Sequence, residues 1–379
     1  MDIALPSPLL GGLTPQVFMR RHWQKQPLLI RQAFPGIEPP VNRSELFSLA
    51  ASEDVESRTV QHEDGEWTLR QGPFAKRQLP TVKTPAWTLL VQGLDLHVPT
   101  AYELLSRFRF VPDSRLDDLM MSYATDGGGV GPHFDSYDVF LLQVQGRRRW
   151  RIGRLNDPVL VPDLPLKILA NFQPEEEWIL EPGDMLYLPP RWAHDGVAEG
   201  ECMTCSIGFR APARDEVGRE VLQRLLDGEE PVANSVLYRD PSQPATDAPG
   251  RIPSTLQEFT KEAVSRLVES PKALACALGE WLSEPKAMVS FDEGKPLRPE
   301  AGLALDRRSR VLYDDEHVFI NGESFRAGGQ DAVLMRQLAD HRFLPAAQWM
   351  RASDEARQLL AEWAAAGWMH STGNDEETA

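Results

Sequence analysis

The chain has 379 residues, of which 42% are hydrophobic and 25% charged, a composition typical of soluble globular proteins with two or three domains. Its net charge of −16 argues against a nucleic-acid binder and fits either solubility or a basic partner. Three cysteines, no apolar stretch of about 18 residues and no cationic start before an apolar run exclude a disulfide scaffold, a membrane span and a secretory signal, so we expect a cytoplasmic protein.

The first hundred residues predict short helices and strands. Thr14 can cap a helix that has Pro15 at its first position and continues to about Trp23. Apolar runs and turn residues then predict, in chain order, a strand over 27–30, a helix over 44–51, a hairpin over 58–70, a strand over 87–91 and a helix over 100–108.

Residues 118–210 have a different pattern of apolar and turn residues. Short apolar runs alternate with Gly and Pro turns and have no helical segments between them, which is typical of an all-β sandwich or barrel. The expected strands cover 120–123, 139–143, 148–152, 178–180, 185–188 and 203–209, and a turn at Gln145-Gly146 is expected to separate the second from the third.

The pattern becomes helical from Arg214. Helices are predicted over 215–226, 254–269 and 271–282, with a Pro-rich connection over 241–253 and a loop over 285–304. Strands over 310–313 and 317–320 precede an Asn321-Gly322 turn and helices over 331–340, 345–349 and 354–366, an order that resembles a winged-helix domain. Residues 301–379 carry 8 basic and 13 acidic side chains, which favours protein docking or packing over DNA binding.

Three separated residues have the chemistry of a facial Fe(II) site. His133 and Asp135 follow a glycine run in the motif G-P-H-F-D, and at two positions apart on a strand they point to the same face. His194 can supply the third ligand, because it follows an E-P-G-D turn, a buried strand and Pro189-Pro190. An isolated H-x-D pair is a weak signal, so the argument depends on the joint pattern.

The strand that starts at Gly146 adds an anion-binding candidate. With a period of two, Arg148 shares a face with Trp150 and Ile152, which should mark the interior. An inward arginine needs an anion partner, and a dicarboxylate cosubstrate would provide one. Arg147, Arg149 and Arg151 share the other face and are interpreted as a solvated basic surface for a ribosome or another anion.

These motifs resemble a known family. G-P-H-F-D, an arginine 15 residues after the histidine, and E-P-G-D-M-L-Y-L-P-P-x-x-x-H are similar to JmjC-type 2-oxoglutarate oxygenases. The segments R-H-W-Q-K-Q-P-L-L-I-R, R-L-D-D-L-M-M-S-Y and G-R-R-R-W narrow the resemblance to the bacterial JmjC-type ribosomal oxygenases, which hydroxylate an arginine of a large-subunit ribosomal protein, the sixteenth in bacterial naming.

The resemblance implies a domain plan. A JmjC double-stranded β-helix, or cupin-like barrel, is expected over 1–212, a helical dimerisation region over 213–285 and a winged-helix-like domain over 286–370, followed by an acidic, disordered tail over 371–379. Apolar residues in excess over 254–282 agree with a homodimer.

The resemblance also implies the cofactors and their ligands. His133, Asp135 and His194 would bind Fe(II), and Arg148 and Ser122 would bind 2-oxoglutarate, which together with O2 yields succinate and carbon dioxide as a substrate C–H bond is hydroxylated. A basic ribosomal protein is the expected substrate.

Residues beside the ligand pair are the candidates for substrate contacts. They are Asp126, Tyr137 and Asp138, although Asp126 could be only a turn residue and Tyr137 only core packing. Two alternatives stay open: hydroxylation of a histidine or lysine in another protein, and a non-catalytic cupin-like binding scaffold.

Overall fold

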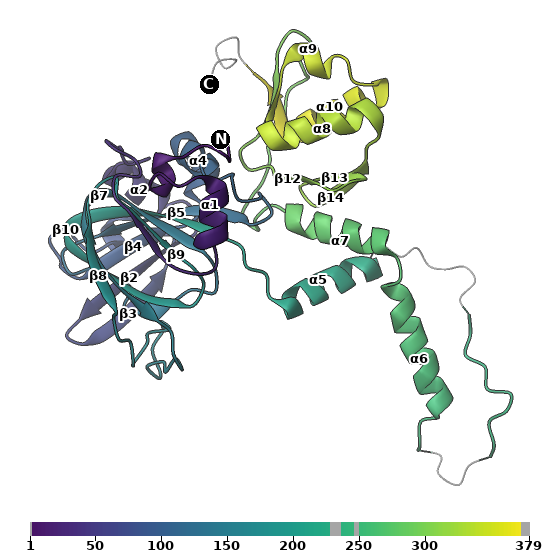
Figure 1. The fold of residues 1–379 in the computed structure, drawn as a ribbon, viewed down its shortest axis with the longest axis horizontal. Coiled ribbons are helices and arrows are strands. Elements are labelled where there is room, and N and C mark those ends of the chain that lie inside the picture. The colour runs from purple at the N-terminus through teal and green to yellow at the C-terminus, as the bar shows by residue number, and fades with distance from the viewer. Residues whose placement is uncertain (1, 228–235, 246–249, 373–379) are drawn as a thin grey trace. The chain divides into compact units, whose positions relative to one another are not determined.

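The computed structural model describes residues 2–227, 236–245 and 250–372 (Figure 1), so most of the tail predicted over 371–379 lies outside the described residues. Contacts divide the chain into two compact units, one ending at Ala211 and the other beginning at Pro212. Among the described residues, no helix is both long and apolar enough to cross a membrane.

The first unit is built on one antiparallel sheet of ten strands, in the order β1-β9-β7-β10-β5-β4-β2-β3, with β6 paired to β10 and β8 to β7. The strands are β1 (Leu28–Ile30), β2 (Ser57–Glu63), β3 (Glu66–Gln71), β4 (Trp87–Val91), β5 (Leu116–Ala124), β6 (His133–Phe134), β7 (Val139–Arg154), β8 (Glu176–Leu180), β9 (Met185–Leu188) and β10 (Trp192–Phe209). Figure 1 shows these strands curling round on one another, and their antiparallel pairing confirms the predicted cupin-like barrel.

Helices pack on the outside of this sheet. They are α1 (Pro15–Arg21), α2 (Arg43–Leu49), α3 (Leu94–His97) and α4 (Pro99–Ser106), with 3-10 turns at Pro8–Leu10 and Lys76–Gln78. The Thr14 side chain caps α1 as predicted, and Asn42 with Glu45 forms a capping box on α2. Phe18, Leu46 and Leu104 from these helices join the large core cluster on the outer face of the sheet.

Strand β7 differs from the prediction in a way that matters for the site. It continues without a turn from Val139 to Arg154, so the expected turn at Gln145-Gly146 is wrong. Gly146 has a φ of +65°, and a Cβ there would lie 2.2 Å from the carbonyl oxygen of Glu201 on β10. The pairing with β10 shifts register at this point, so the feature is a β-bulge rather than a turn.

The bulge exchanges the two faces of β7. Before it, Val139 and Leu141 line the interior, whereas after it the even-numbered Arg148 and Trp150 do so. The predicted alternation of arginines therefore holds within the second half of the strand.

The second unit starts with α5 (Arg214–Asp227), α6 (Ser254–Leu267) and α7 (Pro271–Ser283). It continues with β11 (Leu303–Leu305), β12 (Val311–Tyr313), β13 (His317–Ile320), β14 (Glu323–Arg326), α8 (Gly329–His341), β15 (Phe343–Leu344), α9 (Ala346–Trp349), α10 (Asp354–Ala365) and β16 (Met369–Ser371). Two three-stranded sheets form, β15-β11-β16 and β12-β13-β14, of which the short strands β11, β14, β15 and β16 are absent from the prediction.

Candidate active site

The three predicted metal ligands meet at one point of the barrel interior. His133 and His194 are register partners on β6 and β10, which places their ring centroids 4.2 Å apart although 61 residues separate them in the chain. Asp135 follows β6, and its Oδ2 lies 3.6 Å from the Nε2 of His194. One ligand atom from each of the three residues lies within 4.8 Å of the others.

Backbone carbonyls orient both imidazoles. The Nδ1 of His133 lies 2.9 Å from the oxygen of Gly131, and the Nδ1 of His194 lies 3.0 Å from the oxygen of Trp192. When Nδ1 donates these bonds, the Nε2 lone pair of each ring is available to a metal ion. Burial and the neighbouring His133 lower the pKa of His194 to about 4, so its ring is neutral at pH 7, as a ligand must be.

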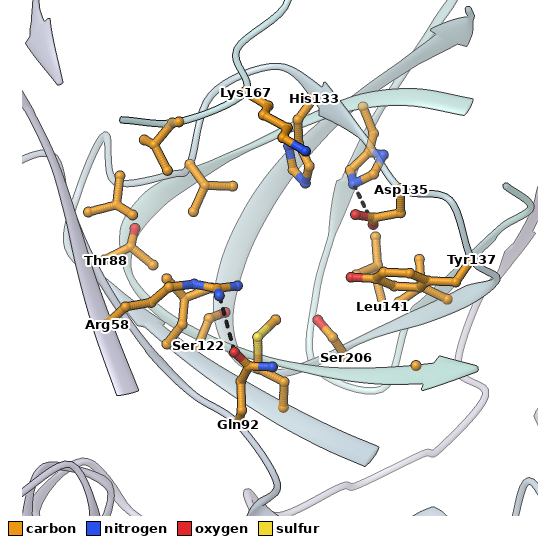
Figure 2. A pocket seen from close by; sticks show the side chains of 18 of the residues that line it. Arg58, Thr88, Gln92, Ser122, His133, Asp135, Tyr137, Leu141, Lys167 and Ser206 are labelled. Carbon is orange, nitrogen blue, oxygen red and sulfur yellow. Dashed lines mark hydrogen bonds and ion pairs between the residues drawn. The ribbon is translucent and has the colours of Figure 1, made fainter. Parts of the chain in front are cut away.

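The triad lines a cavity of about 430 Å³ (Figure 2). Strands β2, β3, β4, β5, β7 and β10 supply its walls, and the segment between β7 and β8 supplies Leu166 and Lys167. Figure 2 shows the Lys167 ammonium group beside His133, and Arg58 donating to the Oε1 of Gln92 at 3.1 Å on the opposite wall.

Arg148 lies inside this cavity, as predicted, and is only 5% exposed. Its Nε and Nη2 have no hydrogen-bond partner within the described part of the chain, and its guanidinium carbon lies 5.7 Å from the centroid of the Trp150 ring. A buried cation with unused donors is costly without an anion, so the surroundings of Arg148 fit a carboxylate ligand.

The other arginines of β7 are not a free basic surface. Arg147 and Arg149 both bind Glu199, Arg149 also binds Glu177, and Arg151 binds Asp195. The interpretation of this face as a docking surface for an anion is therefore wrong, because acidic side chains on β8 and β10 neutralise it.

The remaining predicted contacts divide between the cavity and other places. Ser122 lines the cavity, is 3% exposed and donates to the carbonyl oxygen of Thr204 at 3.4 Å. Tyr137 also lines it, beside Asp135 in Figure 2, and loss of water around the hydroxyl together with the charges of Asp135 and Asp118 raises the pKa of Tyr137.

Asp126 and Asp138 do not line the cavity. The exposed Asp126 accepts a hydrogen bond from the backbone N–H of Gly200 at 2.7 Å, so it is a turn residue. Asp138 is fully buried, where its carboxylate accepts from the Tyr187 hydroxyl at 2.6 Å and from the Gln24 amide at 3.1 Å. The structure therefore corrects both placements: nearness in sequence to the ligand pair does not bring these carboxylates to the site.

Two carboxylates of β5, rather than Asp126 and Asp138, line the cavity. Asp117 and Asp118 line the cavity, and Asp118 is 6% exposed with its Oδ2 accepting from the N–H of Gly93 at 3.0 Å. The alternation of L-D-D-L-M-M-S-Y could have identified Asp118, because it shares a strand face with Ser122. The sequence analysis also misses Arg58 and Lys167 as cavity-lining residues, and nothing in the sequence around either residue indicates that it faces the cavity.

The donor set fits a ferrous ion and a dicarboxylate. Two neutral imidazoles and one carboxylate form the ligand set of non-haem Fe(II) oxygenases, which leaves coordination positions for other ligands. The unpartnered donors of Arg148 in the same cavity match the second carboxylate of a bound 2-oxo acid.

Comparisons with known proteins agree with this geometry. Residues 103–217 match the JmjC domain, and residues 265–370 match the ROXA-like winged helix, which confirms the predicted C-terminal domain type. The chain is 36% identical to the ribosomal protein uL16 3-hydroxylase of Escherichia coli, over 83% of this chain and 86% of the relative. A probable ribosomal oxygenase of Haemophilus influenzae is 31% identical, over 85% of this chain and 84% of the relative.

Solved structures agree as well. The X-ray structure of E. coli YcfD superposes with a TM-score of 0.83 and 32% identity, covering 95% of this chain and 98% of that chain. The ribosomal oxygenase YcfD in complex with cobalt and 2-oxoglutarate has a TM-score of 0.78 and 32% identity, covering 95% and 99%. By its sequence, its two matched domains and the residues gathered in its barrel, the chain belongs to the JmjC-type ribosomal oxygenases.

Proposed function

We propose that this protein is an Fe(II)- and 2-oxoglutarate-dependent oxygenase that hydroxylates an arginine side chain of ribosomal protein uL16. The observation that carries the proposal is the presence of His133, Asp135, His194 and the unpartnered Arg148 in one buried cavity. The name of the E. coli relative, ribosomal protein uL16 3-hydroxylase, supports the choice of substrate.

Each residue of the site has a separate task. The Nε2 atoms of His133 and His194 and the carboxylate of Asp135 would hold the metal ion, and the Arg148 guanidinium would hold the distal carboxylate of 2-oxoglutarate. When bound, iron and 2-oxoglutarate supply, with O2, the oxidation that converts a C–H to a C–OH bond and release succinate and carbon dioxide. Leu141 and Trp150 line the cavity and also belong to a buried hydrophobic cluster.

Carboxylates and an aromatic ring favour arginine as the target. Asp117 and Asp118 enter the cavity from β5, and the partly exposed Tyr137 lies close enough to Asp118 for that charge to affect its hydroxyl. A guanidinium group can accept both kinds of contact at once, since its planar fork pairs with a carboxylate while its face stacks on an aromatic ring. An ammonium group is a compact point charge without a planar fork, so it can neither pair with a carboxylate in the same two-pronged way nor stack a flat face on the ring.

The overall charge favours a basic partner. At a net charge of −16, the protein should attract a basic ribosomal protein, and this attraction should weaken as salt shortens the Debye length from about 10 Å at 0.1 M to about 3 Å at 1 M. We also propose that the protein acts in the cytoplasm, where uL16 is made, and as a homodimer. In support of the dimer, Val264 and Val268 on and after α6 are 55% and 40% exposed.

A matched pair of substrates tests the proposal. Purified uL16 and a version with the target arginine replaced by lysine are incubated with Fe(II), 2-oxoglutarate and O2, and the products are mapped by tandem mass spectrometry. We expect one added oxygen on one arginine of uL16, little on the lysine version, and none with the Asp135→Ala enzyme. An oxygen on a histidine or on the replacement lysine would favour the same-class alternative, and no turnover of 2-oxoglutarate on any ribosomal protein would favour the scaffold.

A further inference from the structure

The indole of Trp150 is an unexplained donor beside the cosubstrate site. Trp150 lines the cavity, is 5% exposed, and its Nε1 has no hydrogen-bond partner within the described residues. Of the buried side-chain donors without a partner in the described part of the chain, those that line this cavity belong to Trp150 and Arg148. A purely structural tryptophan at this depth normally has a partner for its N–H group.

A glycine on the neighbouring strand fixes the position of this ring. Gly196 is the register partner of Trp150 on β10, and a Cβ at Gly196 would lie 2.6–2.9 Å from Cζ3, Cη2 and Cε3 of the indole. These atoms belong to the six-membered ring, on the part of the indole remote from Nε1. The benzene half is therefore packed against the β10 backbone, and the N–H belongs to the half that this contact leaves free.

The ring also lies between the two ends of the proposed cosubstrate site. Its centroid is 5.7 Å from the guanidinium carbon of Arg148 and 5.9 Å from the imidazole centroid of the metal-ligand candidate His194. Trp150 therefore borders the space between the triad and Arg148, where a 2-oxo acid would lie.

We propose that Trp150 is a positioning residue for 2-oxoglutarate, whose indole N–H donates to the same distal carboxylate that Arg148 binds. This inference rests on the proposed function, since it presumes a dicarboxylate in the cavity. Two oxygen atoms of a carboxylate accept several hydrogen bonds, so one anion satisfies the donors of both residues. The guanidinium carbon of Arg148 lies 5.7 Å from the centroid of the indole, so both residues border the same part of the cavity.

The substitution Trp150→Phe isolates the donor, because phenylalanine keeps an aromatic ring against Gly196 and Arg148 and removes the N–H. Isothermal titration of 2-oxoglutarate into the Mn(II)-loaded, full-length protein without O2 should show binding about 10- to 100-fold weaker than in the unsubstituted protein. Trp178→Phe is the matched control. Trp178 is the register partner of Trp150 on β8 but does not line the cavity, so its loss should change the affinity less than twofold.

Steady-state kinetics separates this role from general damage. Trp150→Phe should raise the KM for 2-oxoglutarate and leave the KM for uL16 unchanged, whereas a structural defect would move both constants. The proposal is overturned if Trp150→Phe binds 2-oxoglutarate within twofold of the unsubstituted protein. If the unsubstituted protein does not bind 2-oxoglutarate at all, the proposed function fails instead.

A second measurement uses the unaltered side chain in case Trp150→Phe does not fold. In protein labelled with 15N-tryptophan, the indole signal of Trp150, assigned by sequential triple-resonance experiments, should move on addition of 2-oxoglutarate and exchange more slowly with water. A Trp150 signal that does not respond to saturating 2-oxoglutarate would also contradict the proposal.

Discussion

Replacing Arg148 by alanine gives the most direct test of the cosubstrate site. Arg148 is 5% exposed and has no ion-pair partner among the described residues, so its removal breaks no salt bridge of the described protein. The same change deletes the cation that would bind the distal carboxylate of 2-oxoglutarate. We therefore expect the substitution to remove ligand binding while the ligand-free protein keeps its stability.

The expected loss can be estimated from the number and type of contacts. A hydrogen bond to a charged partner contributes about 1.5–3 kcal/mol, which corresponds to a Kd about 10- to 150-fold higher. For an unsubstituted protein at 100 times the Kd, 2-oxoglutarate raises the free energy of unfolding by about 2.7 kcal/mol. After a loss of about 100-fold, the same concentration contributes only about 0.4 kcal/mol.

Thermal denaturation with and without 2-oxoglutarate measures this difference. Arg149→Ala is the matched control, since Arg149 is one residue away on the opposite face of β7 and is paired with Glu177 and Glu199. It should keep the full stabilisation by the ligand. Equal loss of the ligand effect in the two variants would refute the assignment of Arg148 to the interior, and an unchanged ligand effect in Arg148→Ala would refute its role.

Five further substitutions test other parts of the structure. Asp135→Ala should abolish Mn(II) binding, measured by electron paramagnetic resonance, without changing the free energy of unfolding; wild-type affinity would contradict the triad. Asp118→Asn should raise the KM for uL16 and leave uncoupled 2-oxoglutarate turnover unchanged. Asp138→Asn should leave the KM for uL16 unchanged and lower the free energy of unfolding. The reverse result would place Asp138, not Asp118, in the substrate site. Burial alone would raise the pKa of Asp184, but hydrogen bonds from Gln32, Arg31 and Glu181 lower that pKa overall. The ionised carboxylate therefore stabilises the fold at pH values above its unfolded pKa of about 4, and this stabilisation is lost as the pH falls through the lower folded pKa. The difference in unfolding free energy between Asp184→Asn and the unsubstituted protein should therefore shrink below about pH 4, and a difference independent of pH would contradict the argument. Light scattering should give twice the chain mass of 42.6 kDa, and Val264→Glu should shift the protein toward monomer; a monomeric unsubstituted protein would exclude the dimer.

The sequence predicts the barrel and the triad because both depend on local patterns. Alternating apolar residues, turn glycines and the H-x-D motif are readable one segment at a time, and the structure places His133 and His194 as register partners. The identity of the inward carboxylate on β5 depends instead on which face of that strand is covered. Asp138 is buried among partners that are distant in sequence, because Gln24 and Tyr187 both donate hydrogen bonds to its carboxylate.

The bulge at Gly146 determines how the chain tolerates changes in length. In a surface turn, the loss of one residue is usually absorbed locally. Within β7, Leu141 and Arg148 both line the interior although they are an odd number of positions apart, and the bulge makes this possible. Loss of Gly146 together with the bulge would leave an even number of positions, so regular alternation would still point Arg148 and Trp150 inward. Loss of Arg149, after the bulge, would instead turn Trp150 toward water and bring Arg151 inward, because that part of the strand contains no bulge to remove. We therefore expect a deletion at Gly146 to preserve the proposed cosubstrate donors and a deletion at Arg149 to remove one of them.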